Sequence, residues 1–217
     1  MSKFKITEKT EITRLPKRGV YDKDQINAIL DEALFCTLAY VRETENGPQA
    51  FQVPTGFCRL EDKLYLHGSV GSFYMRELAE KKLPVCISVT IMDGLVLARS
   101  AFHHSVNYRS AVIFSNAEKV TDEGELYKAL EVFTNKMQPG RWNDVRKPSP
   151  GEWKATMVLS FKIDEASAKV RTGGPIDDDE DYSLDIWAGV VPLKQQRMQP
   201  ISDIKLKQSI PLPDYLR

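Results

Sequence analysis

The chain has 217 residues, 42% of them hydrophobic, and its 30 basic residues balance 30 acidic ones. A zero net charge argues against a nucleic-acid binder that works by bulk electrostatic attraction. The three cysteines lie far apart and form no Cys-x-x-Cys pair, which favours a reducing compartment over disulfides or zinc. No signal-like apolar segment and no window near eighteen apolar residues is present, so we expect a soluble cytoplasmic protein that does not enter a membrane.

Residues 1–20 are charged and contain Pro16 and Gly19, and we interpret them as an extended N-terminal arm. A helix is expected over 26–34, because its apolar residues recur at i, i+3, i+4, i+7 and i+8. Strands are expected over 36–42, 50–60 and 63–67. Pro54 lies inside the second of these strands. Because proline cannot donate to a ladder, we expect that strand at a sheet edge, at a bulge or beside a ligand.

A helix is expected over 73–81, followed by strands over 85–91, 95–102 and 111–120, with a turn at Asp93-Gly94. This makes at least six short strands with one helix inserted. Short strands joined by tight turns predict an antiparallel barrel or sandwich rather than a parallel α/β sheet.

The C-terminal half begins with a helix expected over 123–136, followed by a loop with a short helical turn over 141–153. A strand over 157–164 is extended by 168–172. We interpret the acidic run 177–181 as a solvated connector and expect 183–193 to pack back on the body. The domain prediction is therefore an arm over 1–20, one domain over 21–193, and a tail over 194–217 that wraps a surface or a partner chain.

The segment from Leu64 to Ser72, LYLHGSVGS, is the strongest candidate for a binding site. A strand that ends in small and hydroxylated residues before a helix directs free N–H groups and the positive end of the helix dipole at one place. Ser69, Gly71 and Ser72 would form this anion site, with His67 on its rim. The alternative is an ordinary strand–turn–helix junction with Ser72 as N-cap.

Metal binding and two common catalytic chemistries have little support. Adjacent His103 and His104 would point to opposite faces of a strand, and no acidic partner is near them in the sequence, so we expect no metal site. The chain has no G-x-S-x-G, no G-x-G-x-x-G after a strand and no P-loop motif, so serine hydrolysis and the common nucleotide folds are unsupported.

A second polar cluster, SVNYRS, covers 105–110, where Arg109 is a candidate for a bidentate contact with phosphate; a surface salt bridge is the alternative. With the first cluster on a neighbouring strand and VPTG (53–56) on another, the pattern suits an elongated ligand. Such a ligand would carry one phosphate and a flat apolar ring.

Three segments carry a family resemblance: YLHGSVGS (65–72), PVCISVTIMDGLVLARSAFHHSVNYRS (84–110) and DDDEDYSLDIWAGVVPL (177–193). With them the chain resembles the FMN-binding split β-barrel superfamily of pyridoxamine 5′-phosphate oxidase, in the flavin-nucleotide-binding branch related to nitroimidazole-resistance proteins. The resemblance implies a mainly β fold with flanking helices, a six-stranded antiparallel split β-barrel (Greek key). It also implies a homodimer with FMN in the cleft between subunits.

Carried over by position, the resemblance implies roles for ten residues. The backbone of one strand lines the flavin ring, the next strand contacts the ring and ribityl chain, a loop binds phosphate and a further strand reaches the flavin. In that order these residues are Val53, Pro54 and Thr55; Leu66 and His67; Ser69, Gly71 and Ser72; Arg109 and Ser110.

The sequence departs from the family in two places. The family commonly has Arg or Lys directly after the serine of the phosphate loop, where this chain has Phe73 and Tyr74. The oxidase also has a Trp followed by paired arginines near its C-terminus, whereas Trp187 is followed by Ala-Gly-Val and Arg197 stands alone. Vitamin B6 oxidation is therefore not the expected reaction.

The functional expectation is a flavin-dependent oxidoreductase that reduces a small molecule, with the flavin supplying the electron chemistry. No acid, base or nucleophile is assigned. A non-catalytic flavin-binding or storage module is one alternative. A split barrel that binds haem or a deazaflavin is another, with His67, His103 or His104 as axial ligand to haem, and a structural dimer with an empty cleft is a third.

Overall fold

The structure is a computed structural model that describes residues 2–217; Met1, the first residue of the expected arm, lies outside the described residues. The helices are α1 (Lys23–Glu32), α2 (Phe73–Lys81), α3 (Glu123–Met137), α4 (Arg141–Asp144) and α5 (Pro150–Ala155). The strands are β1 (Gly19–Val20), β2 (Phe35–Thr44), β3 (Gly47–Gly56), β4 (Cys58–Leu60), β5 (Lys63–Ser69), β6 (Pro84–Leu97), β7 (Ser105–Asn116), β8 (Glu118–Lys119), β9 (Thr156–Lys162), β10 (Glu165–Arg171) and β11 (Gly189–Pro192).

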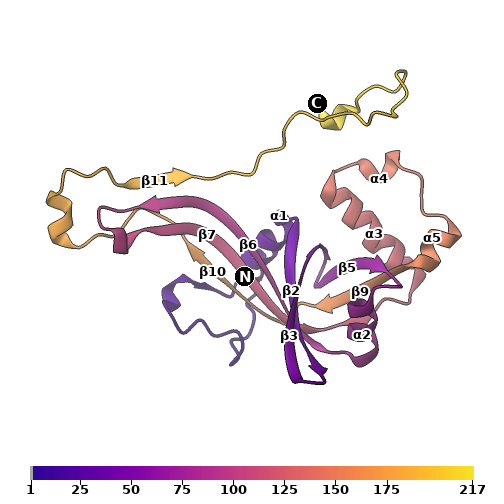
Figure 1. The fold of residues 1–217 in the computed structure, drawn as a ribbon, viewed down its shortest axis with the longest axis horizontal. Coiled ribbons are helices and arrows are strands. Elements are labelled where there is room, and N and C mark those ends of the chain that lie inside the picture. Colours follow the sequence, from indigo (N-terminus) through magenta and orange to yellow (C-terminus); the bar gives the residue numbers. More distant parts are fainter. Residues whose placement is uncertain (1) are drawn as a thin grey trace.

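The strands form two antiparallel sheets. The larger has the order β1-β10-β7-β6-β2-β3, with β11 also paired to β6, and the smaller has the order β4-β5-β9-β8. Figure 1 shows the long β6–β7 hairpin extending away from the end of the molecule that holds the smaller sheet, α2 and α3. The expectation of an antiparallel, mainly β fold with flanking helices is confirmed, although the strands divide into two sheets rather than one set of six.

The core lies between the larger sheet, α1 and the inner face of the smaller sheet. Ile26 and Leu30 of α1 are fully buried against residues such as Leu38, Ile87 and Ile113. A second, smaller cluster lies beneath α3 and includes Cys58, Tyr65, Val120, Ala129 and Val158. Burial of these side chains supplies the main stabilisation of both layers.

The expected helices form where their caps and apolar stripes predict them. Asp22 accepts a hydrogen bond from the Gln25 N–H at the start of α1, and Asp122 accepts one from the Glu125 N–H at the start of α3. The segment 141–153, predicted as a loop with one helical turn, instead contains α4 and most of α5. Pro54 lies in β3, which pairs only with β2, so the prediction of an edge strand is confirmed.

Two predicted strand boundaries are wrong. Asp93-Gly94 does not turn: β6 continues to Leu97 with an irregularity between Met92 and Gly94, and the chain reverses near residues 101–103 instead. The expected strand over 50–60 is divided at Phe57, where the chain leaves β3 in the larger sheet and enters β4 in the smaller one. A sequence pattern cannot separate a bulged strand from a turn when both carry Asp-Gly.

One edge of β6 is shared by two strands. β2 pairs with Val85–Ser88, and β11 pairs with Gly94–Leu97, while β7 occupies the opposite edge along the whole strand. Residues 89–93 thus have no strand partner on this side within the described chain, although the Asp93 carbonyl accepts a hydrogen bond from the Leu193 N–H.

Both ends of the chain contact the body. In the arm, Phe4 is 6% exposed and β1 pairs with β10. The tail beyond residue 193 runs back along the molecule toward α3 (Figure 1), where Gln138 donates a hydrogen bond to the Tyr215 carbonyl. Tail residues Ile201 and Ile204 remain almost fully exposed. No helix in residues 2–217 is both long enough and apolar enough to cross a membrane.

Candidate functional site

The loop between β5 and α2 leaves backbone N–H groups of a helix N-terminus without acceptors in residues 2–217. The Ser69 hydroxyl accepts a hydrogen bond from the Gly71 N–H at 3.0 Å, and the Ser69 carbonyl accepts one from the Ser72 N–H at 2.9 Å. Ser72 occupies the N-cap position, but its side chain makes no capping hydrogen bond. Among the described residues, the N–H groups of residues 73–75 also find no acceptor. These donors and the helix dipole favour a negatively charged group there.

The edge strand β3 approaches the same helix. Pro54 pairs in register with Thr37 of β2, and the outer edge of β3 has no strand partner in residues 2–217. Burial raises the pKa of Tyr74 in the first turn of α2, and the nearby Thr55 side chain opposes this rise. The end of β3 that carries Thr55 therefore lies beside the N-terminal turn of α2.

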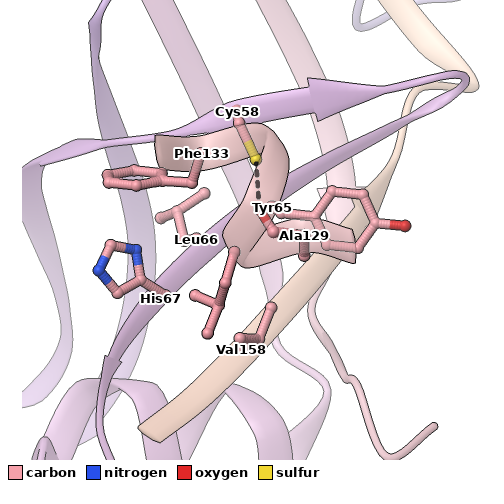
Figure 2. Close-up of a pocket in the computed structure, with 8 residues that line it drawn as sticks. Cys58, Tyr65, Leu66, His67, Ala129, Phe133 and Val158 are labelled. Carbon is pink, nitrogen blue, oxygen red and sulfur yellow. Dashed lines mark hydrogen bonds between the residues drawn. The ribbon is translucent and has the colours of Figure 1, made fainter. Parts of the chain in front are cut away.

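Leu66 and His67 lie on β5 with different exposure. Leu66 is 1% exposed and packs into the core, so its side chain supports the site from within. His67 is half-buried, and its ring meets Phe133 of α3 edge-on with centroids 4.2 Å apart (Figure 2). The space among the side chains in Figure 2 is too small for a water molecule.

The His67 imidazole is largely shielded from water. Its Nδ1 is buried and has no hydrogen-bond partner in the described chain, and burial lowers its pKa. A neutral imidazole with a free nitrogen is able to accept a hydrogen bond or bind a metal.

Arg109 and Ser110 lie elsewhere, on β7 in the larger sheet. Arg109 donates two hydrogen bonds to Asp93, at 2.8 and 2.7 Å, and two to Glu32, one of them at 2.8 Å. These two carboxylates raise the pKa of Arg109, and Arg109 lowers the pKa of each. Ser110 donates to the Lys169 carbonyl at 3.3 Å.

The prediction that the two polar clusters lie on neighbouring strands is wrong. β5 belongs to the smaller sheet, and β7 is flanked by β10 and β6 in the larger one. Within this chain the structure gathers the β3 segment, His67 and the β5–α2 loop, but it does not bring Arg109 to them. The alternative explanation of Arg109, an ion pair, is the one that its contacts show.

The sequence did not single out Arg42 of β2. Its guanidinium carbon lies 4.2 Å from the centre of the Phe51 ring and 5.2 Å from that of Phe73, the first residue of α2. A lone arginine in a strand carries no motif, and the only signal was the absence of a cation at Phe73 itself.

The tip of the β6–β7 hairpin also differs from expectation. His103 and His104 lie at a short 3-10 turn rather than on a strand. His103 Nε2 lies 3.2 Å from an Asp178 carboxylate oxygen, so the expectation that it has no acidic partner is wrong. Asp181 completes a group of three candidate ligands around His103, of which only Asp178 is fully exposed. His104 Nδ1 lies 3.0 Å from the Ser100 carbonyl oxygen.

Asp177 contradicts the interpretation of 177–181 as a solvated connector. It is 7% exposed, and its carboxylate accepts hydrogen bonds from the Arg99 N–H and guanidinium, both at 3.0 Å. The sequence could not reveal this contact, because Arg99 lies 78 positions earlier. The other acidic residues of the run are more exposed.

Comparisons with solved structures find this architecture again. The flavocytochrome Anf3 from Azotobacter vinelandii is 35% identical, with a TM-score of 0.87 over 97% of this chain and 95% of that one. The FAD and haem binding protein from Mycobacterium smegmatis is 38% identical, with a TM-score of 0.84 over 91% of this chain and 95% of that one.

A putative 5-nitroimidazole antibiotic resistance protein from Bacteroides thetaiotaomicron, 23% identical over 70% of this chain and 86% of that one, shares the fold with a TM-score of 0.57. These similarities confirm the split-barrel fold and its open sheets. No curated protein sequence matches the chain. Residues 22–170 match the family model described as pyridoxamine 5′-phosphate oxidase. The chain therefore belongs to the pyridoxamine 5′-phosphate oxidase family.

Proposed function

We propose that this protein binds a flavin and a haem and transfers electrons between them and a small molecule. The observation that carries the proposal is similarity over nearly the whole chain, including much of the tail, to a flavocytochrome and to an FAD and haem binding protein. Both are more than a third identical to this chain, and each match covers 95% of the other protein.

The residues of the β5–α2 loop fit the phosphate end of a flavin. The first-turn N–H groups of α2 have no acceptor in the described residues, and the Ser72 hydroxyl makes no capping hydrogen bond. Both are therefore able to donate to an anion. The unpaired edge of β3 at Pro54 leaves space for a flat ring against the backbone. The flavin would supply the redox chemistry, and these residues would bind and orient it.

The flavin is proposed to be FAD rather than the FMN implied by the sequence resemblance. Support comes from the Mycobacterium smegmatis protein, which is described as binding FAD. The proposed site accepts either, because both carry a phosphate next to the ribityl chain.

Haem is supported by the orientation of His104. A ring nitrogen that faces a carbonyl oxygen fixes the tautomer, so that Nδ1 donates to Ser100 and the exposed Nε2 is free to bind iron. Phe102 beside it is 89% exposed and offers an apolar contact for a porphyrin. By comparison, His103 faces a carboxylate and His67 is closely packed against Phe133.

A homodimer is proposed to complete the site. Phe35 and Val41 lie on one face of β2, and Met92 continues that face on β6; all three side chains are about half exposed or more. A second copy would cover these residues and form the cleft in which the flavin lies. Size-exclusion chromatography with light scattering is expected to give twice the chain mass.

The test is the visible spectrum of the purified protein before and after NADPH is added. We expect a flavin band and a Soret band, with FAD identified after acid extraction, and reduction of the flavin by the nucleotide. Bound flavin that NADPH and NADH leave oxidised would favour a storage module. A colourless protein that takes up neither added FAD nor added FMN would overturn the proposal.

The haem assignment is tested by three variants. His104→Ala is expected to abolish the Soret band, whereas His103→Ala and His67→Ala are expected to retain it. A Soret band that survives His104→Ala and disappears in one of the others would move the ligand to that histidine.

A further inference from the structure

The phosphate loop of this chain lacks a cation where the family commonly has one, because Phe73 follows Ser72. In the folded chain a cation nevertheless reaches this place from another strand. The Arg42 guanidinium lies over the Phe73 ring at 5.2 Å and over the Phe51 ring at 4.2 Å. Phe73 is the first residue of α2 and Glu77 lies one turn further on, so the Arg42 guanidinium lies beside the first turn of that helix.

The two rings hold Arg42 without using its hydrogen-bond donors. Contact with the two ring faces does not use the guanidinium N–H groups as conventional hydrogen-bond donors. Within residues 2–217, Arg42 makes no side-chain hydrogen bond. Its nearest carboxylate is Glu77, with 3.9 Å between Nη1 and Oε2, which is too long for a hydrogen bond. The two rings therefore fix the position of the Arg42 charge, and its N–H donors remain available to a ligand.

Glu77 has a second cationic partner, although its buried Oε2, which faces Arg42, accepts no hydrogen bond within the described residues. Its other oxygen, Oε1, accepts a hydrogen bond from Lys81 at 2.8 Å, one turn further along α2. Arg109, the cation that the sequence suggested, already has two carboxylate partners. Its guanidinium is shared between Glu32 and Asp93, so a phosphate would have to displace both.

We propose that Arg42 binds the flavin phosphate at the N-terminus of α2 and replaces the cation missing at position 73. This inference rests on the proposed function. The phosphate would receive the Arg42 guanidinium on one side and the Ser72 hydroxyl and first-turn N–H groups of α2 on the other. Phe51 and Phe73 fix the guanidinium, which lowers the entropic cost of the contact.

The experiment compares flavins with and without phosphate. FAD, FMN and riboflavin are titrated into apoprotein of the wild type and of Arg42→Ala, and binding is followed by quenching of flavin fluorescence. We expect Arg42→Ala to weaken FAD and FMN about ten-fold or more, as for loss of a charge-assisted hydrogen bond, while riboflavin affinity stays unchanged. Arg42→Lys keeps the charge but not the planar fork, so it should restore part of the loss.

Lys128→Ala is the control, because it removes one positive charge from an exposed position on α3, where Lys128 pairs with Glu131 and not with Glu77. It should leave the preference for FMN over riboflavin intact. Equal weakening of all three flavins by Arg42→Ala, or no weakening, would overturn the role of Arg42 and leave flavin binding standing. Failure of the wild type to bind any of the three would overturn the proposed function and this role with it.

Discussion

Gly68 of β5 and Met75 of α2 lie so close that a Cβ on Gly68 would stand 2.4 Å from the Met75 sulfur. Only glycine at this position allows the strand that carries His67 to lie so close to the helix whose N-terminus we propose as an anion site. We predict that Gly68→Ala destabilises the protein by about 1–3 kcal/mol, because the buried Met75 must move. Urea unfolding of the two proteins measures the difference.

Gly151 in α5 is the control for this substitution, since nothing lies within 4 Å of the Cβ that alanine would add there. Gly151→Ala should be neutral or slightly stabilising, because alanine favours helix. If Gly68→Ala unfolds at the same urea concentration as the wild type, the close approach of β5 and α2 does not constrain the loop.

Lys136 of α3 predicts a rise in stability at alkaline pH. Burial lowers its pKa to about 8, while its ammonium donates to the Leu30 carbonyl at 2.8 Å and lies 3.7 Å from the centre of the Phe57 ring. The unfolded chain, with the ordinary lysine value of 10.5, binds more protons between these two pH values. The free energy of unfolding contributed by Lys136 therefore increases from about pH 8 to pH 10.5.

Lys136→Met should remove this increase, and the difference between the two unfolding curves isolates it from other groups that titrate in the range. Lys128→Met, on an exposed part of the same helix, is the control for the loss of one positive charge from α3. Parallel stability curves for wild type and Lys136→Met would contradict the prediction.

The cysteines should react with a thiol reagent in an order set by burial. Burial raises the pKa of Cys36 and of Cys58 to about 12, so neither forms much thiolate in the native protein. We expect Ellman's reagent to modify these two only after unfolding.

Cys86 is half-buried on the face of β6 that we propose to lie in the dimer interface. Its reaction rate should fall as protein concentration rises and the dimer forms. Cys86→Ser should abolish native labelling. Rapid native labelling that persists in this variant would show that Cys36 or Cys58 is accessible.

The bridge from Arg109 to Glu32 and Asp93 joins α1 to the centre of the larger sheet. Because hydrogen bonds from Arg109 lower the pKa of both carboxyls, its stabilisation is complete above their ordinary values of 4.5 and 3.8 and is lost as pH falls through the lowered ones. Arg109→Met should cost about 1 kcal/mol at neutral pH. The difference in the free energy of unfolding between Arg109→Met and the wild type should disappear in acid.

Arg146→Met, which breaks a more exposed pair with Glu152, should have a smaller effect at neutral pH. Chemical unfolding of all three proteins at neutral pH and below pH 3.8 measures both differences. A constant gap between wild type and Arg109→Met over this range would show that packing, not charge, accounts for it.

Local patterns predicted much of this fold. The helix over 73–81 has the predicted bounds, and Pro54 correctly marked an edge strand, because capping, periodicity and proline geometry act within a few residues. The strand–turn–helix junction at residues 63–81 followed from the same local rules.

Contacts between distant residues decided the rest. Asp93-Gly94 has turn chemistry, yet Asp93 is held in a continuous strand by Arg109, 16 positions later. Asp177 has the composition of a solvated loop but is buried against Arg99. Arg42 reaches α2 only because β2 passes beside it. None of these pairings has a local signal, so the position of Arg42 beside α2 could not be predicted before the fold was known.

The shared edge of β6 predicts where amide hydrogens of the larger sheet exchange fastest with solvent. Residues 85–88 and 94–97 have a paired strand on each side, which protects their amide hydrogens from exchange. Among residues 89–93, the amide hydrogens that face away from β7 have no paired strand in the described chain. Deuterium should therefore enter β6 first at its middle rather than at its ends. A ligand or a second subunit that covers this edge should slow amide exchange at residues 89–93 before exchange changes elsewhere in the strand.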